Sequence, residues 1–184
     1  MSPLSTDADR ARFDALVREI IDPVRGYLHR RTDDATADDV LSETLVALWR
    51  RLDDVPADAA IPWSIGVARL QLKNAERSRR RQGLLAQRIV AIDPPREVAE
   101  EDPRDDSGDR AVRRALAALK PAEAELLRLW IWEELEPREI ASVLDISANA
   151  AAIRLHRARK RFAEEFRKHG DGVGHDGVKE GGGR

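Results

Sequence analysis

The chain of 184 residues contains no cysteine, and aromatic residues make up only 4% of it. The absence of cysteine excludes disulfide bonds, thiol catalysis and cysteine-ligated zinc, and it suits a reducing compartment. No apolar run approaches the roughly 18 residues that suggest a membrane-spanning helix, and no signal-peptide pattern is found. We therefore expect a cytoplasmic protein that makes no use of a membrane.

The alternation of apolar and polar residues that is typical of β-strands is also absent. Apolar residues instead recur at the three- and four-residue spacing of helices. A first helix carries Phe13 to Leu28, and Pro23 is expected to break or kink it. Thr36 and Asp39 resemble a capping box that opens the next helix. The apolar stripe of that helix is Leu41, Leu45, Leu48 and Leu52.

The remaining helices follow from the same spacing. A loop over 53–61 leads to a helix from Trp63 to about Arg81, and a short helix begins near Arg110. A further helix is expected over Ala122 to Leu135, with an inward face of Leu126, Leu127, Trp130 and Ile131. Tryptophans are usually largely buried, so Trp49, Trp130 and Trp132 are interpreted as packing residues. For Trp63, a place in the core is favoured over the alternative, a platform on which a DNA base stacks.

Neither sign of charge is in large excess, since the formal net charge is only -2 although 36% of the residues are charged. Affinity for nucleic acid must therefore come from segregated charge. Segregation is present. The stretch Arg69 to Arg81 holds six cations against one carboxylate, whereas Asp93 to Asp109 holds eight carboxylates against two arginines. The acidic stretch, which contains three prolines, is typical of a flexible linker.

The segment Glu139 to Phe162 has the spacing of a helix-turn-helix that reads DNA. Asp145 lies at the turn, where aspartate tolerates a left-handed backbone better than most residues. Ser147 can cap the second helix. The face of this helix that packs inward carries Ala151, Leu155, Ala158 and Phe162. The opposite face carries Asn149, Ala150, Ile153, Arg154, Arg157, Lys160 and Arg161.

A basic amphipathic helix can also be an ordinary solvated surface. Ile153 favours DNA binding, because an apolar residue among cations can contact a thymine methyl group in the major groove; the alternative is a contact with a partner protein. His156 has no second histidine or cysteine at ligand spacing. We therefore expect neither a metal nor a cofactor.

Three strings occur in this order: DDVLSETLVALWRRL, PWSIGVARLQLKNAERSRRR and EIASVLDISANAAAIRLHRARKRF. Together they resemble bacterial RNA polymerase sigma factors of the extracytoplasmic-function group. The resemblance implies an all-α protein with two small helical domains joined by a flexible acidic linker. The implied parts are an N-terminal domain at 8–82, a linker at 83–109, a C-terminal helix-turn-helix domain at 110–169 and a disordered tail at 170–184.

The resemblance also implies roles for individual residues. The residues implied to dock on core RNA polymerase are Asp39, Ser42, Glu43 and Leu45. At the position of Ser42, relatives commonly have glutamine. The proximal promoter element is contacted by Trp63, Arg69, Lys73, Asn74 and Arg77. The distal element is contacted by Ser147 and the outward face of the helix that follows it. Gly66 and Leu70 depart from the usual pattern, so the preferred promoter bases cannot be transferred.

The expected function is to bind core RNA polymerase and promoter DNA and to direct transcription initiation. An anti-sigma partner is expected by resemblance only. A stand-alone helix-turn-helix regulator would leave the N-terminal charge pattern without a purpose, and an adaptor would bind polymerase without promoter dependence. An enzyme is not expected, because no catalytic triad, phosphate loop or paired histidine ligands occur.

Overall fold

The computed structural model describes residues 6–89 and 107–170, and within these ranges its regular elements are all helical. The elements are α1 (Asp7–His29), α2 (Asp34–Arg50), a 3-10 turn η1 (Leu52–Asp54), α3 (Ala60–Ile89), α4 (Ser107–Ala117), α5 (Pro121–Ile131), α6 (Pro137–Leu144) and α7 (Ala148–Gly170). The expected all-α class is confirmed. Most of the acidic linker and of the tail lies outside the described residues, while 83–89 belong to α3 and 107–109 to α4.

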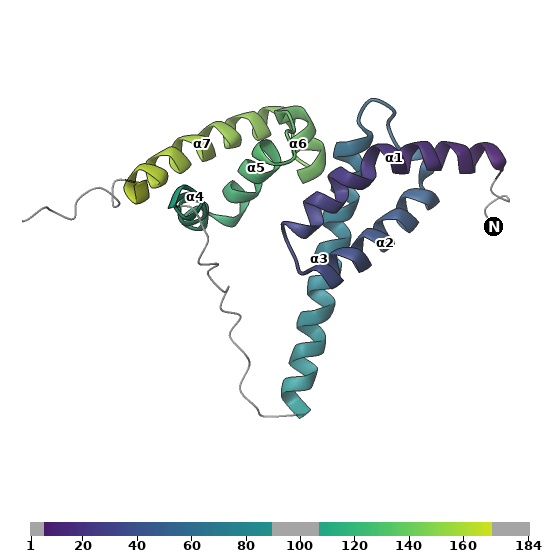
Figure 1. Cartoon of the computed structure of the whole chain (residues 1–184), viewed down its shortest axis with the longest axis horizontal. Helices are drawn as coiled ribbons and strands as arrows, with labels where there is room; N and C mark the ends of the chain where they lie inside the picture. Colours follow the sequence, from purple (N-terminus) through teal and green to yellow (C-terminus); the bar gives the residue numbers. More distant parts are fainter. Residues whose placement is uncertain (1–5, 90–106, 171–184) are drawn as a thin grey trace, which may run out of the picture. The chain divides into compact units, whose positions relative to one another are not determined.

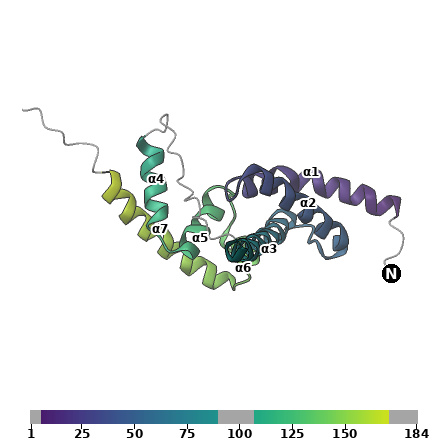
Figure 2. The ribbon, with the colours of Figure 1, turned by 90° about the horizontal axis from the view of Figure 1, so that it is seen from below.

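The chain divides into two compact units. Unit 1 combines Met1–Arg96 with Arg128–Ala152, and unit 2 combines Glu97–Leu127 with Ile153–Arg184. In unit 1, α1, α2 and α3 lie side by side and contact one another (Figures 1 and 2). The buried residues of these three helices include Ile20, Val24, Tyr27, Leu28, Ala37, Val40, Leu48, Ile65, Ala68 and Leu72.

Helix α1 continues through Pro23, so the expected break is not found. Proline removes one backbone donor from a helix interior. The residues that follow it, Val24, Tyr27 and Leu28, are all buried and continue the stripe formed by Leu16 and Ile20. Their burial, worth about 1.5–3 kcal/mol for a fully buried Val or Leu side chain, offsets the missing hydrogen bond.

Helix α2 begins earlier than the sequence pattern suggested. Its N-cap is Asp33, whose carboxylate accepts hydrogen bonds from the backbone N–H and the hydroxyl of Thr36 at 3.0 and 2.9 Å. The prediction that Thr36 and Asp39 form the capping box was therefore wrong. Thr36 is instead buried in the first turn, and Asp39 is exposed.

The buried stripe of α2 is also shifted from the expected one. Leu41, Leu48 and the following Leu52 are buried as predicted, but Leu45 is only half-buried. Thr44 is fully buried in its place, and its hydroxyl donates to the carbonyl of Val40 at 2.7 Å. A buried hydroxyl costs little when it is hydrogen-bonded, so the polar residue can occupy the core.

Helix α5 ends at Ile131 rather than at Leu135. Glu134 has a φ of 55°, and this left-handed residue turns the chain so that the N–H of Leu135 bonds to the carbonyl of Leu129 at 3.1 Å. Leu126 and Leu127 are buried as predicted. Trp130, Ile131 and Trp132 are exposed, so their interpretation as inward packing residues was wrong.

Glu133 in unit 1 is an almost completely buried carboxylate, with 2% of its side chain exposed. It forms ion pairs with Arg30 and with Arg31, the latter at 2.9 Å. The Arg31 guanidinium also lies 3.7 Å from the centre of the Tyr27 ring. Burial of a charge requires such partners, because an unpaired buried charge is strongly destabilising.

We predict that the Asp33 cap makes stability depend on acidity. The hydrogen bonds from Thr36 lower the pKa of the Asp33 carboxyl to about 2, with a smaller effect of Arg79. Because this pKa lies below the unfolded value of about 3.9, the carboxylate stabilises the fold above about pH 4 and loses that effect as the pH falls towards 2.

The variant Asp33→Ala should therefore melt at a lower temperature than the natural chain at pH 6, and the two melting temperatures should converge as the pH is lowered towards 2. Thermal unfolding followed by circular dichroism measures both. Asp14→Ala, an exposed position on α1, is the matched control. A difference that does not change between pH 6 and pH 2 would contradict the assigned cap.

Candidate nucleic-acid interface

The turn between α6 and α7 has the geometry that its sequence predicts. Pro137 opens α6, and Asp145 ends it with a φ of 55° in the left-handed region. The N–H of Ile146 then bonds to the carbonyl of Ala141 at 3.0 Å. Ser147 caps α7, since its hydroxyl accepts from the N–H of Ala150 at 3.2 Å. The turn of the predicted helix-turn-helix is thus confirmed.

Helix α7 buries small and apolar residues along one side. Ala151, Leu155 and Ala158 are buried, and Phe162 is half-buried and stacks on Phe166 with a centroid distance of 5.9 Å. The residues predicted to face outward are exposed, apart from the half-buried Ala150. They are Asn149, Ile153, Arg154, Arg157, Lys160 and Arg161.

The cations of this outward face differ in their partners. Within the part of the chain that the structure describes, Arg154, Arg157 and Lys160 form no ion pair. Arg161 is paired, because its Nη1 lies 2.9 Å from each carboxylate oxygen of Glu123. Three of the four predicted cations are thus available to an anionic ligand. Ile153 lies among them with 44% of its surface exposed.

A second cationic row lies on α3. Arg69, Lys73 and Arg77 follow one another at four-residue spacing, so they lie along one side of the helix. Lys73, Asn74 and Arg77 are exposed, and Arg69 is half-buried. None of the three cations has an ion pair with another described residue. This helix begins at Ala60, so the loop before it is shorter than expected.

Trp63 lies near the start of α3 and is half-buried. The Arg51 guanidinium lies 5.0 Å from the centre of its ring, a distance suited to a cation–π contact. Trp63 is therefore held by a neighbouring cation and also keeps part of its surface open.

The residues predicted to dock on polymerase lie on α2. Asp39, Ser42 and Glu43 are exposed, and the hydroxyl of Ser42 donates to the carbonyl of Asp38 at 3.0 Å. Helical spacing adds a residue that sequence reasoning missed. Val46 continues the row of positions 39, 42 and 43, and 48% of its surface is exposed. Leu45 is half-buried and lies to the side of this row.

Within residues 6–89 and 107–170, no group of three or more metal-ligating side chains is present. No helix in the same residues is long and apolar enough to cross a membrane.

Comparison with known protein families gives two matches. Residues 16–82 match Sigma-70 region 2, which takes in α2, most of α1 and most of α3. Residues 109–162 match Sigma-70 region 4, which takes in the helix-turn-helix. The chain is also 29% identical over 160 residues to RNA polymerase sigma factor CarQ of Myxococcus xanthus, which covers 86% of this chain and 91% of the relative.

The chain belongs to the sigma-70 family, in the extracytoplasmic-function group. As a sigma factor it binds core RNA polymerase and directs promoter-specific initiation of transcription.

Two solved structures share the fold of this sigma factor. The sigma factor RpoE of Bartonella quintana, in complex with the anti-sigma factor NepR, matches with a TM-score of 0.59 at 19% identity, covering 84% of this chain and 96% of that one. CnrH in complex with the cytosolic domain of CnrY matches with a TM-score of 0.56 at 22% identity, covering 88% of this chain and 99% of that one. At these identities the likeness concerns the fold.

We predict that the left-handed backbone conformation of Asp145 contributes to the stability of the helix-turn-helix in this sigma factor. Asp145→Gly should leave the melting temperature unchanged or slightly higher, because glycine adopts positive φ freely. Asp145→Val should destabilise by about 1–2 kcal/mol, since a β-branched residue is strained there. Thermal unfolding and promoter binding by the polymerase complex measure both variants. Equal effects of the two substitutions would contradict a role for the backbone conformation.

Proposed function

We propose that three surfaces of this sigma factor each bind a different part of the initiation complex. The row of exposed residues on α2 docks on core RNA polymerase, the cationic row on α3 holds the proximal promoter element as it opens, and α7 reads the distal element. We also propose that 8–82 and 110–169 act as the two functional domains. The observation that carries the proposal is that Arg69, Lys73 and Arg77 of α3 and Arg154, Arg157 and Lys160 of α7 have no ion-pair partner among the described residues.

The assignment of α7 to the major groove rests on the chemistry of its outward face. Asn149 and Arg154 carry donors that suit base edges or phosphates, and Ile153 is an exposed apolar group. Hydrogen bonds and apolar contacts to base edges give sequence specificity, whereas phosphate contacts give position. Arg157 can serve in either way, and Lys160 suits a phosphate as a point charge.

The assignment of α3 to opening DNA rests on a row of cations on the same helix as a partly open aromatic ring. Lys73 and Arg77 are exposed and can hold the backbone of a single strand. Asn74 is exposed beside them and offers both a donor and an acceptor to an unpaired base. Trp63 is partly open at the beginning of the same helix. These groups are the ones that single-stranded DNA requires.

The assignment of α2 to polymerase docking rests on a mixed surface. Asp39 and Glu43 provide negative charge, and Val46 provides an exposed apolar group on the same side. Ser42 uses its hydroxyl within its own helix, so it offers the partner little beyond its small size. We propose that the two carboxylates supply orientation and that Val46 supplies the buried centre of the contact.

Two DNA-binding modules gain from being held by one polymerase, because the second contact becomes effectively intramolecular. The free sigma factor should then bind promoters weakly. We further propose that it performs no chemistry of its own and works in the cytoplasm. RpoE and CnrH were each solved with a protein partner, and RpoE with an anti-sigma factor; we propose that a partner of this kind also restrains this chain.

We predict that Arg157→Ala weakens promoter binding by about 1–3 kcal/mol and relaxes specificity at one position if Arg157 reads a base. If it contacts only phosphate, the loss should be similar for all sequences. Binding of the reconstituted polymerase complex to promoter fragments with single base changes distinguishes these results. Arg18→Ala, an exposed position on α1, should have no effect. Unchanged binding by Arg157→Ala would remove α7 from the DNA interface.

We predict that Glu43→Lys weakens the complex with core polymerase, because it reverses a charge at the centre of the docking surface. Co-purification with core polymerase measures the effect, and run-off transcription should fall in proportion. Asp22→Lys makes the same change at an exposed position on α1 and should bind normally. A chain that binds promoters without polymerase, and is indifferent to Glu43→Lys, would instead be a stand-alone regulator.

A further inference from the structure

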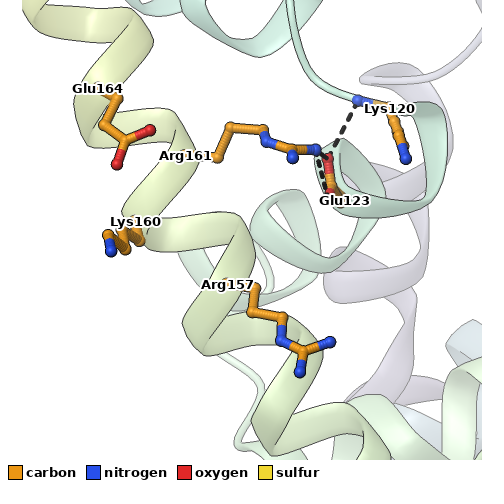
Figure 3. Close-up of a pocket in the computed structure, with 6 residues that line it drawn as sticks. All are labelled: Lys120, Glu123, Arg157, Lys160, Arg161 and Glu164. Carbon is orange, nitrogen blue, oxygen red and sulfur yellow. Dashed lines mark hydrogen bonds and ion pairs between the residues drawn. The ribbon is translucent and has the colours of Figure 1, made fainter.

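A cleft of about 400 Å³ in unit 2 is lined by residues of α7, by Glu123 of α5 and by Lys120, which directly precedes α5. Its lining residues are Lys120, Glu123, Arg157, Lys160, Arg161 and Glu164. Figure 3 shows the side chain of Arg161 reaching from α7 to Glu123, with Arg157 one helical turn away on α7. Four cations and two carboxylates thus share one surface hollow.

The Glu123 carboxylate is already occupied by groups of the protein itself. Both of its oxygens lie 2.9 Å from Nη1 of Arg161, and one also accepts from the backbone N–H of Lys120 at 3.3 Å. Only 22% of the Glu123 side chain is exposed. Transfer of Arg161 to a phosphate would leave this partly buried carboxylate without its cation, which is costly. The ion pair therefore favours a fixed Arg161.

Unlike Arg161, the side chain of Lys120 is not held by a carboxylate of the described residues. Lys120 is exposed, and its ammonium has no ion-pair partner among the described residues. It lines the same cleft as Arg157, which likewise has no ion pair within the described part of the chain. Once Glu123 and Arg161 neutralise each other, the remaining charges of the cleft are Lys120, Arg157 and Lys160 against Glu164. The cleft therefore keeps an excess of positive charge beside the outward face of α7.

We propose that Arg161 is a positioning residue that ties α7 to α5 through Glu123, and that Lys120 makes the contact to a DNA phosphate at this edge of α7. This inference rests on the proposed function of α7 as the helix that reads the distal element. It reassigns one residue that the sequence pattern placed at the DNA, and it adds one that lies outside the helix-turn-helix.

The test uses the full chain bound to core polymerase and a promoter fragment, with affinity measured over a series of potassium chloride concentrations. Each lost phosphate contact lowers the slope of log affinity against log salt by about 0.9. Lys120→Gln should lower the slope by about this amount and weaken binding to all promoter sequences alike. Arg161→Gln should weaken binding without changing the slope. Lys168→Gln, on α7 but outside the cleft, is the control that should change neither.

Glu123→Gln gives results of opposite sign for the two roles of Arg161. If Arg161 positions α7, this variant should weaken binding as much as Arg161→Gln does, and the double variant should be no weaker than either. If Arg161 instead contacts phosphate, removal of the competing carboxylate should strengthen binding. Circular dichroism of each variant confirms that the helices are retained.

The inference is overturned by a lower slope for Arg161→Gln, by an unchanged slope for Lys120→Gln, or by stronger binding of Glu123→Gln. Failure of the underlying function looks different. In that case Arg157→Ala would also leave promoter binding intact. Weaker binding by Arg157→Ala together with no effect of Lys120→Gln would therefore reject only the role of Lys120.

Discussion

The rotation of α7 about its own axis is the constraint on which the proposed DNA recognition depends. Ala151, Leu155 and Ala158 are buried on one side, and this burial decides which side chains are left to the solvent. A change in this rotation would bring different side chains to the DNA. The turn at Asp145 and the cap at Ser147 fix where the helix begins, and the buried side fixes its orientation. The buried side of α7 and the residues of the turn therefore determine which side chains form the proposed interface.

Pairing of charges decides which cations can serve a polyanion. The chain is slightly acidic as a whole, with a formal net charge of -2, so an arginine count says little about DNA binding. Arg79 is bound to Asp33 at 3.2 Å and Arg161 to Glu123, and both are thereby committed to holding helices together. Lys73 and Arg154 have no such partner among the described residues. A carboxylate within reach thus separates structural cations from those left for a nucleic acid.

The sequence predicted local features better than those that depend on packing between distant residues. The left-handed Asp145 and the Ser147 cap follow from chemistry within a few residues, and both were correctly predicted. The exposure of Trp130 was missed because it depends on which neighbours pack over α5, and the helical spacing that placed it beside buried Leu126 and Leu127 does not specify them. The pair of Arg161 with Glu123 joins residues 38 positions apart, so no local pattern signals it. The burial of Thr44 was not predicted, because a polar residue was not expected in the core. Its hydroxyl can be buried because it donates to a carbonyl of its own helix.

Exposed apolar side chains give the three proposed surfaces a common design. About half of the surface is exposed for Val46 on α2 (48%), Leu70 on α3 (58%) and Ile153 on α7 (44%). Single exposed apolar residues are ordinary on proteins and form no patch that drives aggregation. Here each lies among polar or charged neighbours on a surface that we assign to polymerase or DNA. Burial of such a side chain by the partner removes apolar surface from water, at about 25 cal/mol per Å², while the surrounding charges set the orientation. Because each gain is small and arises only when a partner covers the side chain, we expect no single one of the three proposed contacts to be tight by itself.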